Sequence, residues 1–489
     1  MPTSATAQVD AMQPPPAPQT NALDRFFQIT ARGSSISREI RGGLATFFAM
    51  AYIIVLNPII LGAGHDKFGH QLENGQLVTA TALMAGLTTI LMGVIGNVPI
   101  ALAAGLGINA VVSLQLAPKM SWPDAMGMVV LAGLVLMILV ASGLRQRVMD
   151  AIPGGLRRAI AIGIGLFIVL IGLVDSGFVT RNPDAAHTTV PMGLGIDGRL
   201  QGWPVVIFVV GLALTFMLVV RRTRGAILIG IVSMAVTAII INSLVDIPDQ
   251  SWGLSVPRVP EKIVDTPDFG LIGNVSLFGG FHEVGLLTGS LFVFTVLLSG
   301  FFDAMGTIIA VGEEAGLMDD EKGQMPNMGR ILMVDGIAVA GGGFGSASAN
   351  TCFVESTAGV GEGARTGFAN LVTGGLFLLA LVFTPLARVV PSQAATPALV
   401  VVGFLIMAAN VREIDWSDFT IAVPAFLTMV SMPFTYSITN GIGIGVLSFI
   451  LLRIADRRAR EIPWLLNAVG LCFLVYFLLE PIEQLLGVK

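Results

Sequence analysis

The chain has 489 residues, of which 54% are hydrophobic and only 12% are charged, and its formal net charge is -5. Soluble domains carry about 25% charged residues, so this composition, with a mean hydropathy of +0.82, excludes a soluble globular protein. Stretches of about 20 residues without a charge recur along the chain, and each is long enough to cross a ~30 Å hydrocarbon layer. The sequence therefore indicates a polytopic membrane protein embedded in a lipid bilayer.

The N-terminal stretch differs in composition from the rest of the chain. It contains "MQPPPAPQ" and has no apolar core of the kind that a signal peptide needs. A polar, Pro-rich segment cannot bury enough apolar surface to fold by itself. We therefore predict a disordered cytoplasmic tail over residues 1–40.

Fourteen membrane spans are predicted from the charge-free stretches. They lie near residues 43–62, 77–96, 99–118, 124–142, 156–174, 204–220, 225–244, 284–312, 330–344, 346–362, 367–390, 396–411, 417–433 and 438–454. A further apolar segment at 464–481 either spans the membrane or lies in the interface, and its placement stays open.

The arginines of the connections predict the orientation. With the spans counted as above, four arginine groups fall on one side of the membrane: residues 25–41, 145–158, 221–224 and 453–460. Cytoplasmic loops carry the excess of Lys and Arg. The sequence thus predicts a multi-pass protein of the cell membrane with a cytoplasmic N-terminus.

Two stretches of the sequence resemble each other and suggest an internal repeat. Residues 47–55 in the first span read "FFAMAYIIV", and residues 301–311 in the eighth span read "FFDAMGTIIAV". A repeat of seven spans is odd in number, so its second copy inserts upside down. Inverted repeats are typical of transporters, which bind substrate near the midplane where helices are broken.

The third span of each half is the predicted site of such a break. "NVPIALAAGLGINAVVS" begins at residue 97 and "GGGFGSASANTCFVESTAGVGEG" begins at residue 341, and both are rich in Gly and small residues. Irregular backbone at membrane depth is tolerated where it lines a cavity. We predict a short strand followed by a half-helix in each, with half-helices starting near Asn109 and Glu355. The alternative is that these glycines only permit close helix packing.

Three acidic residues lie inside predicted spans: Asp303, Asp335 and Glu355. An intramembrane carboxylate costs about 2.5 kcal/mol or more to insert, so it marks a candidate functional site. Asp303 shares a small, polar helix face with Ser299 and Thr307. The alternative for Asp303 and Glu355 is a structural role as carboxylates hydrogen-bonded to a neighbouring helix.

Two carboxylates with an amide between them suit a neutral ligand that offers both hydrogen-bond donors and acceptors. Such acids also bind and release protons, which favours proton coupling, although Na⁺ coupling stays open. Phe353, next to Glu355, could stack on a flat heterocycle or serve only for packing. The chain has no metal-ligand spacing and no nucleophile and base pattern, so we expect no metal, no cofactor and no catalytic residue.

These motifs resemble those of the AzgA-like purine permeases, in the superfamily that also holds the uracil and xanthine permeases. The resemblance lies in "TFFAMAYIIVLNPIIL", "AAGLGINA", "FFDAMGT", "GRILMVDGIA", "ESTAGVGEGARTGF" and "AFLTMVSMPFTYSITNGI" and runs from about residue 40 to about 455. It implies an all-α fold of seven plus seven inverted spans with a core domain at 41–142 and 283–390. It also implies a gate domain at 150–245 and 396–455, followed by a C-terminal segment at 463–489.

The resemblance also assigns site residues. The eighth-span D-x-x-G pattern matches Asp303 and Gly306, the tenth-span E-S-x-A-G pattern matches Glu355 and Ser356, and the third-span asparagine matches Asn109. With Thr351 and Phe353, these residues are implied to bind the purine, and Asp303 or Glu355 is implied to carry the coupled proton. Where relatives have a Thr-rich strand this chain has "SASANTCF", which leaves the particular purine open.

The resemblance thus implies a proton-coupled symporter that imports guanine, hypoxanthine or adenine by an elevator-like motion. A homodimer is expected, and nucleic acid is not expected as a partner. Two alternatives remain from the sequence. One is a carrier of the same fold for uracil, xanthine, urate or an organic anion, and the other is a membrane enzyme that uses the two acids.

Overall fold

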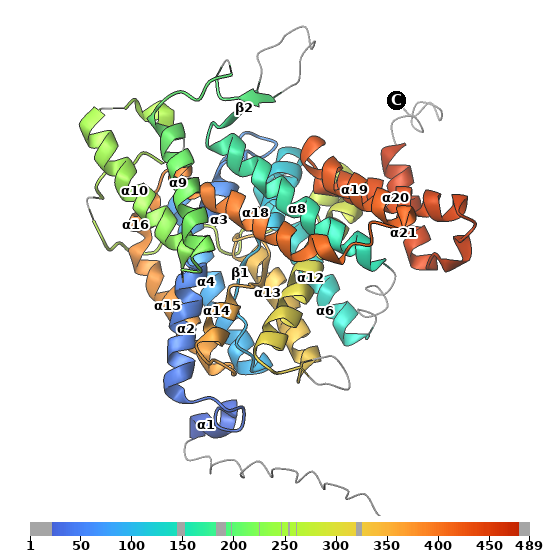
Figure 1. Cartoon of the computed structure of the whole chain (residues 1–489), viewed down its shortest axis with the longest axis horizontal. Coiled ribbons are helices and arrows are strands. Elements are labelled where there is room, and N and C mark those ends of the chain that lie inside the picture. The colour runs from blue at the N-terminus through green and yellow to red at the C-terminus, as the bar shows by residue number, and fades with distance from the viewer. Residues whose placement is uncertain are drawn as a thin grey trace, which may run out of the picture.

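The computed structural model describes residues 22–143, 152–181, 192–196, 198–223, 225–245, 247–252, 255–260, 262–318 and 325–478. The side chains at positions 302, 303, 305, 306, 309, 310, 313 and 388 lie outside this description. The described chain is mainly helical, with two short two-stranded sheets. Both lie at connections or breaks, and helices form the bulk of the molecule (Figure 1).

The first half of the chain contains the elements α1 to α10. In order they are α1 (Ala22–Phe27), α2 (Ile36–Met50), α3 (Ile53–Gly62), α4 (Asn74–Leu91), the π-helical turn η1 (Met92–Gly96), β1 (Leu102–Ala104), α5 (Leu106–Val111), the π-helical turn η2 (Val112–Leu116), the 3-10 turn η3 (Ala117–Lys119), α6 (Trp122–Ala141), α8 (Gly154–Asp175), β2 (Val179–Arg181), β3 (Met192–Leu194), α9 (Trp203–Val220) and α10 (Ala226–Val245).

The second half follows the 3-10 turn η4 (Asp249–Trp252). Its elements are α11 (Gly279–Val284), α12 (Leu286–Glu314), α13 (Met328–Phe344), β4 (Asn350–Cys352), α14 (Ser356–Gly361), α15 (Phe368–Ala380), the 3-10 turn η5 (Leu381–Phe383), α16 (Thr384–Arg388), α17 (Ser392–Ala395), α18 (Pro397–Asn410), the 3-10 turn η6 (Val411–Glu413), α19 (Phe419–Phe434), α20 (Ile438–Ala455), the 3-10 turn η7 (Ala459–Glu461) and α21 (Trp464–Phe477).

The breaks predicted in the third and tenth spans are confirmed. Strand β1 leads into the short helix α5, and strand β4 leads into the short helix α14. The two strands pair antiparallel, with Leu102 opposite Cys352 and Ala104 opposite Asn350. Equivalent segments of two oppositely inserted repeats run in opposite directions, so this antiparallel pair is what the inverted arrangement requires.

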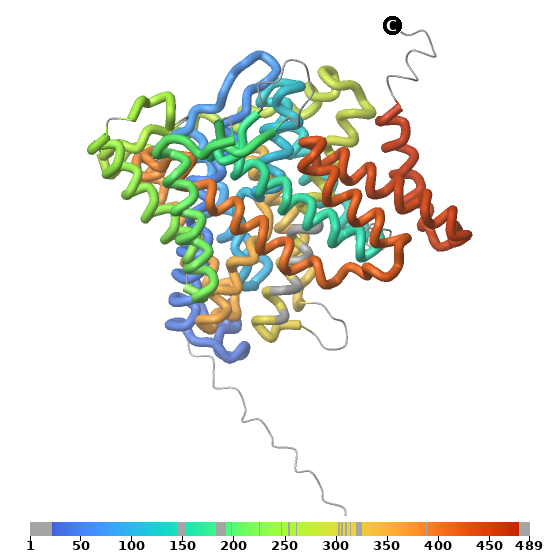
Figure 2. The backbone as a smooth tube through the Cα atoms, turned by 45° about the horizontal axis from the view of Figure 1, so that its top comes forward, coloured from blue at the N-terminus to red at the C-terminus, as the bar shows by residue number. Residues whose placement is uncertain are grey.

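The helices pack in two groups. In the first, α6 packs on α13, and α15 packs on α2 and α4. In the second, α8 packs on α18 and α19, α9 packs on α10, and α19 packs on α20. Figures 1 and 2 both show α8 and α18 running across the front of the first group. The spans of the first group are those predicted for the core domain, and those of the second are predicted for the gate. The exact domain boundaries stay a prediction.

Glycines allow the closest helix contacts within both groups. A Cβ atom placed on Gly367 would lie 1.9 Å from the carbonyl oxygen of Gly93 in the first group. In the second group, a Cβ on Gly403 would lie 2.4 Å from the carbonyl oxygen of Gly165. Small residues of this kind let helix backbones approach closely inside a membrane, where apolar side chains alone give little drive to associate.

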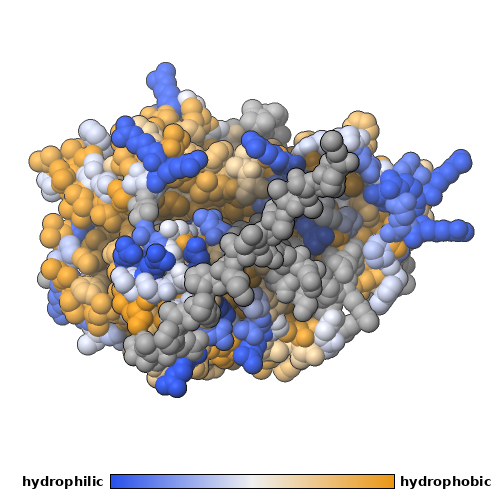
Figure 3. Space-filling view, turned by 60° about the horizontal axis from the view of Figure 1, so that its bottom comes forward, coloured by the Kyte–Doolittle hydropathy of each residue, from blue (hydrophilic) through white to orange (hydrophobic). Residues whose placement is uncertain are grey.

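The outer surface of the described structure fits a lipid environment. Within the described residues, nine helical stretches are at least 18 residues long and apolar enough to cross a membrane. Shorter apolar stretches are Leu286–Phe301, which is the first part of α12, and the helices Phe419–Phe434 and Trp464–Phe477. Figure 3, with the end bearing α1 turned forward, shows patches of hydrophilic side chains among apolar ones. Helix α21 (Trp464–Phe477) covers most of the predicted 464–481 segment, so the described part of this segment is helical.

The predicted disorder of the N-terminal tail is corrected for residues 22–40. Helix α1 forms within this stretch, and α2 already begins at Ile36. Phe27 and Ile29 are buried, and the Phe27 ring meets that of Phe368 with centroids 5.6 Å apart. Asp24 accepts hydrogen bonds from the backbone N–H and the hydroxyl of Thr30 at 2.8 and 2.7 Å. Docking on the bundle supplies the apolar burial that this segment lacks by itself, and residues 1–21 lie outside the described part.

Candidate functional site

A cavity lies where β4, α5 and α12 of the first group face α8 and α18 of the second. It is lined by Tyr52, Gly105, Leu106, Gly107, Ile108, Ala161, Ile164, Ile168, Ser299, Thr307, Cys352, Phe353, Val354, Glu355, Val402 and Ile406. The predicted meeting of the two broken spans therefore forms the wall of a cavity.

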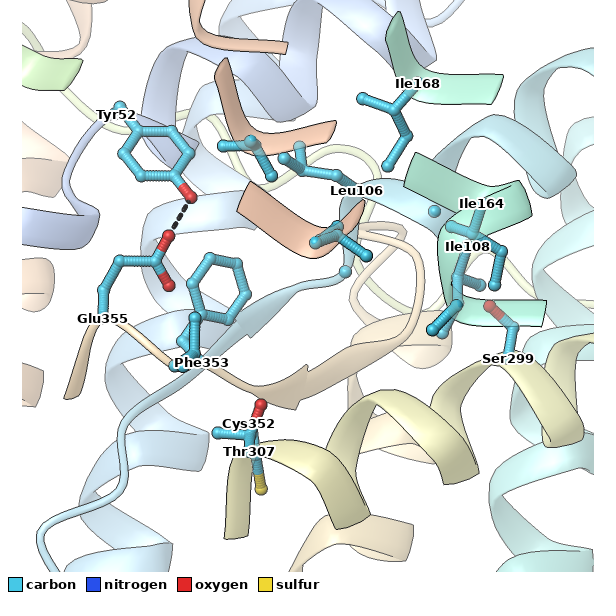
Figure 4. A pocket seen from close by; sticks show the side chains of 16 residues that line it. Tyr52, Leu106, Ile108, Ile164, Ile168, Ser299, Thr307, Cys352, Phe353 and Glu355 are labelled. Atoms are coloured by element: carbon cyan, nitrogen blue, oxygen red, sulfur yellow. Dashed lines mark hydrogen bonds between the residues drawn. The ribbon is translucent and has the colours of Figure 1, made fainter. Parts of the chain in front are cut away.

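Glu355 is the one carboxylate among the described side chains that line this cavity. It occupies the N-cap position of α14, separated from the end of β4 by Phe353 and Val354, and its side chain makes no capping hydrogen bond. Instead, its Oε1 atom accepts a hydrogen bond of 2.5 Å from the hydroxyl of Tyr52 (Figure 4). The break in the tenth span thus places the Glu355 carboxylate at the cavity, and the Tyr52 side chain of the first span orients it.

Tyr52 reaches Glu355 from the middle of the first span. Helix α2 ends at Met50, Ala51 and Tyr52 form a short turn that keeps helical backbone angles, and α3 begins at Ile53. Tyr52 is 1% exposed, so its ring is enclosed while its hydroxyl points toward the cavity acid. The sequence predicted one span over 43–62, and Ile36–Gly62 is one apolar helical stretch with this local turn inside it.

The opposite wall of the cavity is apolar. Ile164 and Ile168 of α8 and Val402 and Ile406 of α18 face the strand and half-helix breaks. Figure 4 shows Ile164 and Ile168 on the side of the cavity opposite Glu355. The cavity therefore pairs a polar edge with a hydrophobic face, which is the environment that a flat, weakly polar ring prefers.

Phe353 lines the cavity beside Glu355, as the stacking prediction requires. Ser356 and Thr351 are fully buried and are not among the lining residues. The Ser356 hydroxyl accepts from the Ala101 N–H at 3.0 Å and donates to the Phe353 carbonyl at 2.7 Å, so it ties the two broken spans together. These two residues shape the site from behind it.

Asn109 is also fully buried and is not among the lining residues, although its neighbours Gly105 to Ile108 line the cavity. Within the described residues, neither its amide nitrogen nor its amide oxygen has a hydrogen-bond partner. A buried amide without partners is unfavourable by about 1–3 kcal/mol for each group. The structure thus places Asn109 in α5, one layer behind the cavity wall.

Asp303 and Gly306 lie in α12, and their side chains fall outside the described part of the structure. Position 303 is one helical turn from Ser299 and one from Thr307, and both of these residues line the cavity. The backbone of α12 therefore brings the predicted acid-bearing turn to the cavity wall.

A third acid lies behind β4. Asp335 of α13 is fully buried, and its Oδ1 atom is 3.7 Å from the Sγ atom of Cys352, which donates to it. Cys352 itself lines the cavity. The link of Asp335 to the cavity strand was not predicted from the sequence, and neither was Tyr52 as a lining residue. Ser299 and Thr307, which the sequence placed on one helix face with Asp303, line the cavity.

A closed helical bundle of inverted repeats, with a small cavity between its two groups and a buried acid in that cavity, defines a membrane carrier. Residues 37–444 match the family model Xan_ur_permease, whose description reads "Permease family". The chain belongs to this permease family, and the resemblance inferred from its motifs is confirmed.

Relatives of nearly the full length are themselves permeases. The guanine/hypoxanthine permease PbuG of Bacillus subtilis (strain 168) is 38% identical, with 93% of this chain and 99% of that protein covered. The adenine permease AdeQ of Escherichia coli (strain K12) is 34% identical, with 94% and 97% covered. Their names are those of transporters, which bears out the prediction that the chain is a carrier and no enzyme.

Solved structures share the fold at low sequence identity. The transmembrane domain of the cyanobacterial bicarbonate transporter BicA matches with a TM-score of 0.58 and 15% identity, covering 84% of this chain and 97% of that one. The structure of SLC26A9 matches with a TM-score of 0.59 and 13% identity, covering 86% and 66%. These likenesses support the predicted fold class.

Proposed function

We propose that this permease is a proton-coupled symporter that imports purine nucleobases. The observation that carries the proposal is the Glu355 carboxylate, held by Tyr52 at the edge of a mainly apolar cavity. A carboxylate there accepts ring or amino N–H groups, while the apolar wall takes the face of the heterocycle. The names of the relatives, which are guanine/hypoxanthine and adenine permeases, support the same substrate class.

Three sets of contacts recognise the base in this proposal. Glu355 accepts its N–H donors, and Phe353 provides an aromatic face for stacking, in the offset geometry that aromatic pairs prefer. The hydroxyls of Ser299 and Thr307 on α12 are within the same cavity and can donate to ring nitrogens or a carbonyl oxygen. Guanine, hypoxanthine and adenine each offer such a mixed pattern of donors and acceptors.

Proton coupling is assigned to the pair Asp303 and Glu355. A carboxylic acid in a low-dielectric site exchanges its proton according to the medium that it faces. The base and the proton then cross together when the first helix group, the core, slides against the second, the gate, in an elevator-like motion. The cavity lies at the boundary of these groups, so such a motion carries it from one side of the membrane to the other.

The setting of the transporter in the cell is part of the proposal. The arginine distribution supports a cytoplasmic N-terminus and a location in the cell membrane. Two copies are proposed to associate as a homodimer through their gate groups. The gates then stay fixed while each core moves.

Uptake into proteoliposomes tests the substrate class. With the purified protein and an imposed inward proton gradient, radiolabelled hypoxanthine should accumulate, and unlabelled guanine or adenine should compete with it. Uracil and an organic anion should compete weakly. If uracil, urate or an organic anion is accumulated and purines are not, the carrier has another substrate and the proposal fails.

A further inference from the structure

Tyr52, which donates the hydrogen bond to Glu355, occupies in the first repeat the position that Thr307 occupies in the second. In "AYIIV" Tyr52 precedes a pair of isoleucines, and in "GTIIAV" Thr307 precedes the corresponding pair. Both residues line the cavity, one from each half of the chain. The two repeats thus each contribute a hydroxyl from this equivalent position to the same cavity, and among the described residues the Tyr52 hydroxyl is the one bonded to the acid.

The contact between Tyr52 and Glu355 is polar and directional. An O–H to carboxylate bond of 2.5 Å falls in the range of charge-assisted hydrogen bonds, which are about twice as strong as neutral ones. No other residue in the described part of the chain donates to this carboxylate. Packing alone would be satisfied by phenylalanine, so the hydroxyl serves the acid.

Resting on the proposed function, we propose that Tyr52 is a positioning residue that sets which bases the site accepts. Its hydroxyl occupies Oε1 and holds the carboxylate as an acceptor, so that Oε2 is presented to the ligand. The site then selects a base that brings an N–H donor to this oxygen. A base that is methylated at that nitrogen cannot donate a hydrogen bond to Oε2. This oxygen is then buried without a donor, which is unfavourable.

Without the hydroxyl, the acid is free to turn or to take up a proton, and an acid that carries a proton also donates. Selection for an N–H donor should therefore weaken when Tyr52 is changed to Phe. This effect differs from that of a packing defect, which would weaken the binding of every base by the same factor.

Binding of hypoxanthine and its singly N-methylated derivatives to the purified protein tests the proposal. In the wild type, the derivative that binds most weakly identifies the nitrogen facing Glu355. Tyr52→Phe should weaken hypoxanthine binding by about tenfold or more and should reduce the discrimination against that derivative to a few-fold. Glu355→Asp, whose shorter side chain withdraws from Tyr52, should reduce the same discrimination.

Tyr476→Phe is the matched control, because Tyr476 lies on α21 and is not among the residues lining the cavity. It should bind all the compounds as the wild type does, and size-exclusion profiles and melting temperatures should show that each variant is folded. Unchanged hypoxanthine binding by Tyr52→Phe, or an equal loss for hypoxanthine and the derivative, would overturn the role of Tyr52. If the wild type binds no purine, the proposed function fails as well.

Discussion

Glu355 reaches the cavity because only two residues separate the end of β4 from this N-cap position of α14, and it keeps its direction because Tyr52 of the first span donates a hydrogen bond to it. The charge pattern of the sequence singled out Glu355, since a carboxylate inside a membrane span is costly and rare. Nothing in the pattern singled out Tyr52. An aromatic residue in an apolar run is typical of packing, and only the three-dimensional contact shows its use.

At the residue scale, the two acids should differ sharply from acids elsewhere. Glu355→Gln should abolish purine uptake, because an amide offers a donor where the base needs an acceptor. Asp303→Asn should impair uptake severely, because the amide cannot carry a proton. Radiolabelled uptake at matched surface expression measures both effects.

The control for the acid variants is Glu283→Gln. Glu283 is an exposed residue whose partner is Lys67, and such surface pairs contribute about 0–1 kcal/mol. Its uptake should equal that of the wild type. Normal uptake by Glu355→Gln and Asp303→Asn would remove both residues from the site.

At the element scale, the strand and half-helix breaks of the third and tenth spans were predictable from their glycines and small polar residues. The short turn at Ala51 and Tyr52 was not, because "FFAMAYIIV" has no glycine or proline and is typical of an undistorted helix. The positions of Asn109, Thr351 and Ser356 behind the wall also depend on the β1 and β4 pairing. A one-residue change in that register would exchange the faces, and sequence alone does not fix the register.

The close packing of α8 against α18 can be tested by filling the space at Gly403. Gly403→Ala should lower the melting temperature of the purified protein, because the added Cβ would lie 2.4 Å from the Gly165 carbonyl oxygen. Overpacking of this kind costs about 1–3 kcal/mol. Gly375→Ala in α15 has nothing within 4 Å of its Cβ and should be tolerated. Equal melting temperatures for the two variants would contradict the packing described.

At the scale of the whole molecule, polar contacts join the two helix groups. The Oε1 atom of Gln115, in η2 of the first group, accepts from the hydroxyl of Thr439, in α20 of the second, at 3.1 Å. The Ser437 hydroxyl donates to the same atom at 3.2 Å. An elevator-like motion must break these bonds, so joining the groups covalently at this place should stop transport.

A cross-link between the groups checks that motion. Gln115→Cys combined with Thr439→Cys, bridged by a short thiol-reactive reagent, should block uptake, while each single variant treated in the same way should retain it. The exposed Cys472 should be changed to Ala in this background, whereas Cys352 is buried. Undiminished uptake by the bridged protein would rule out sliding at this boundary.

Energy coupling is a separate property of the whole molecule. When a protonophore collapses the pH gradient, the purine concentration inside should rise no higher than the concentration outside. The two sides then have the same proton activity, so proton binding by the acids no longer drives accumulation. Replacing sodium with choline should leave uptake unchanged. The reverse result, loss with sodium removal and indifference to the protonophore, would show a sodium-coupled carrier.

Binding of a panel of bases to the purified protein tests the central claim most directly, since it needs neither a gradient nor a known direction of transport. Hypoxanthine, guanine, adenine, xanthine, urate and uracil would be compared by calorimetry on the wild type and on Glu355→Gln. We predict saturable binding of at least one of hypoxanthine, guanine and adenine, lost in the variant, and no comparable binding of uracil. Binding of uracil or urate alone, or purine binding unaffected by Glu355→Gln, would contradict it.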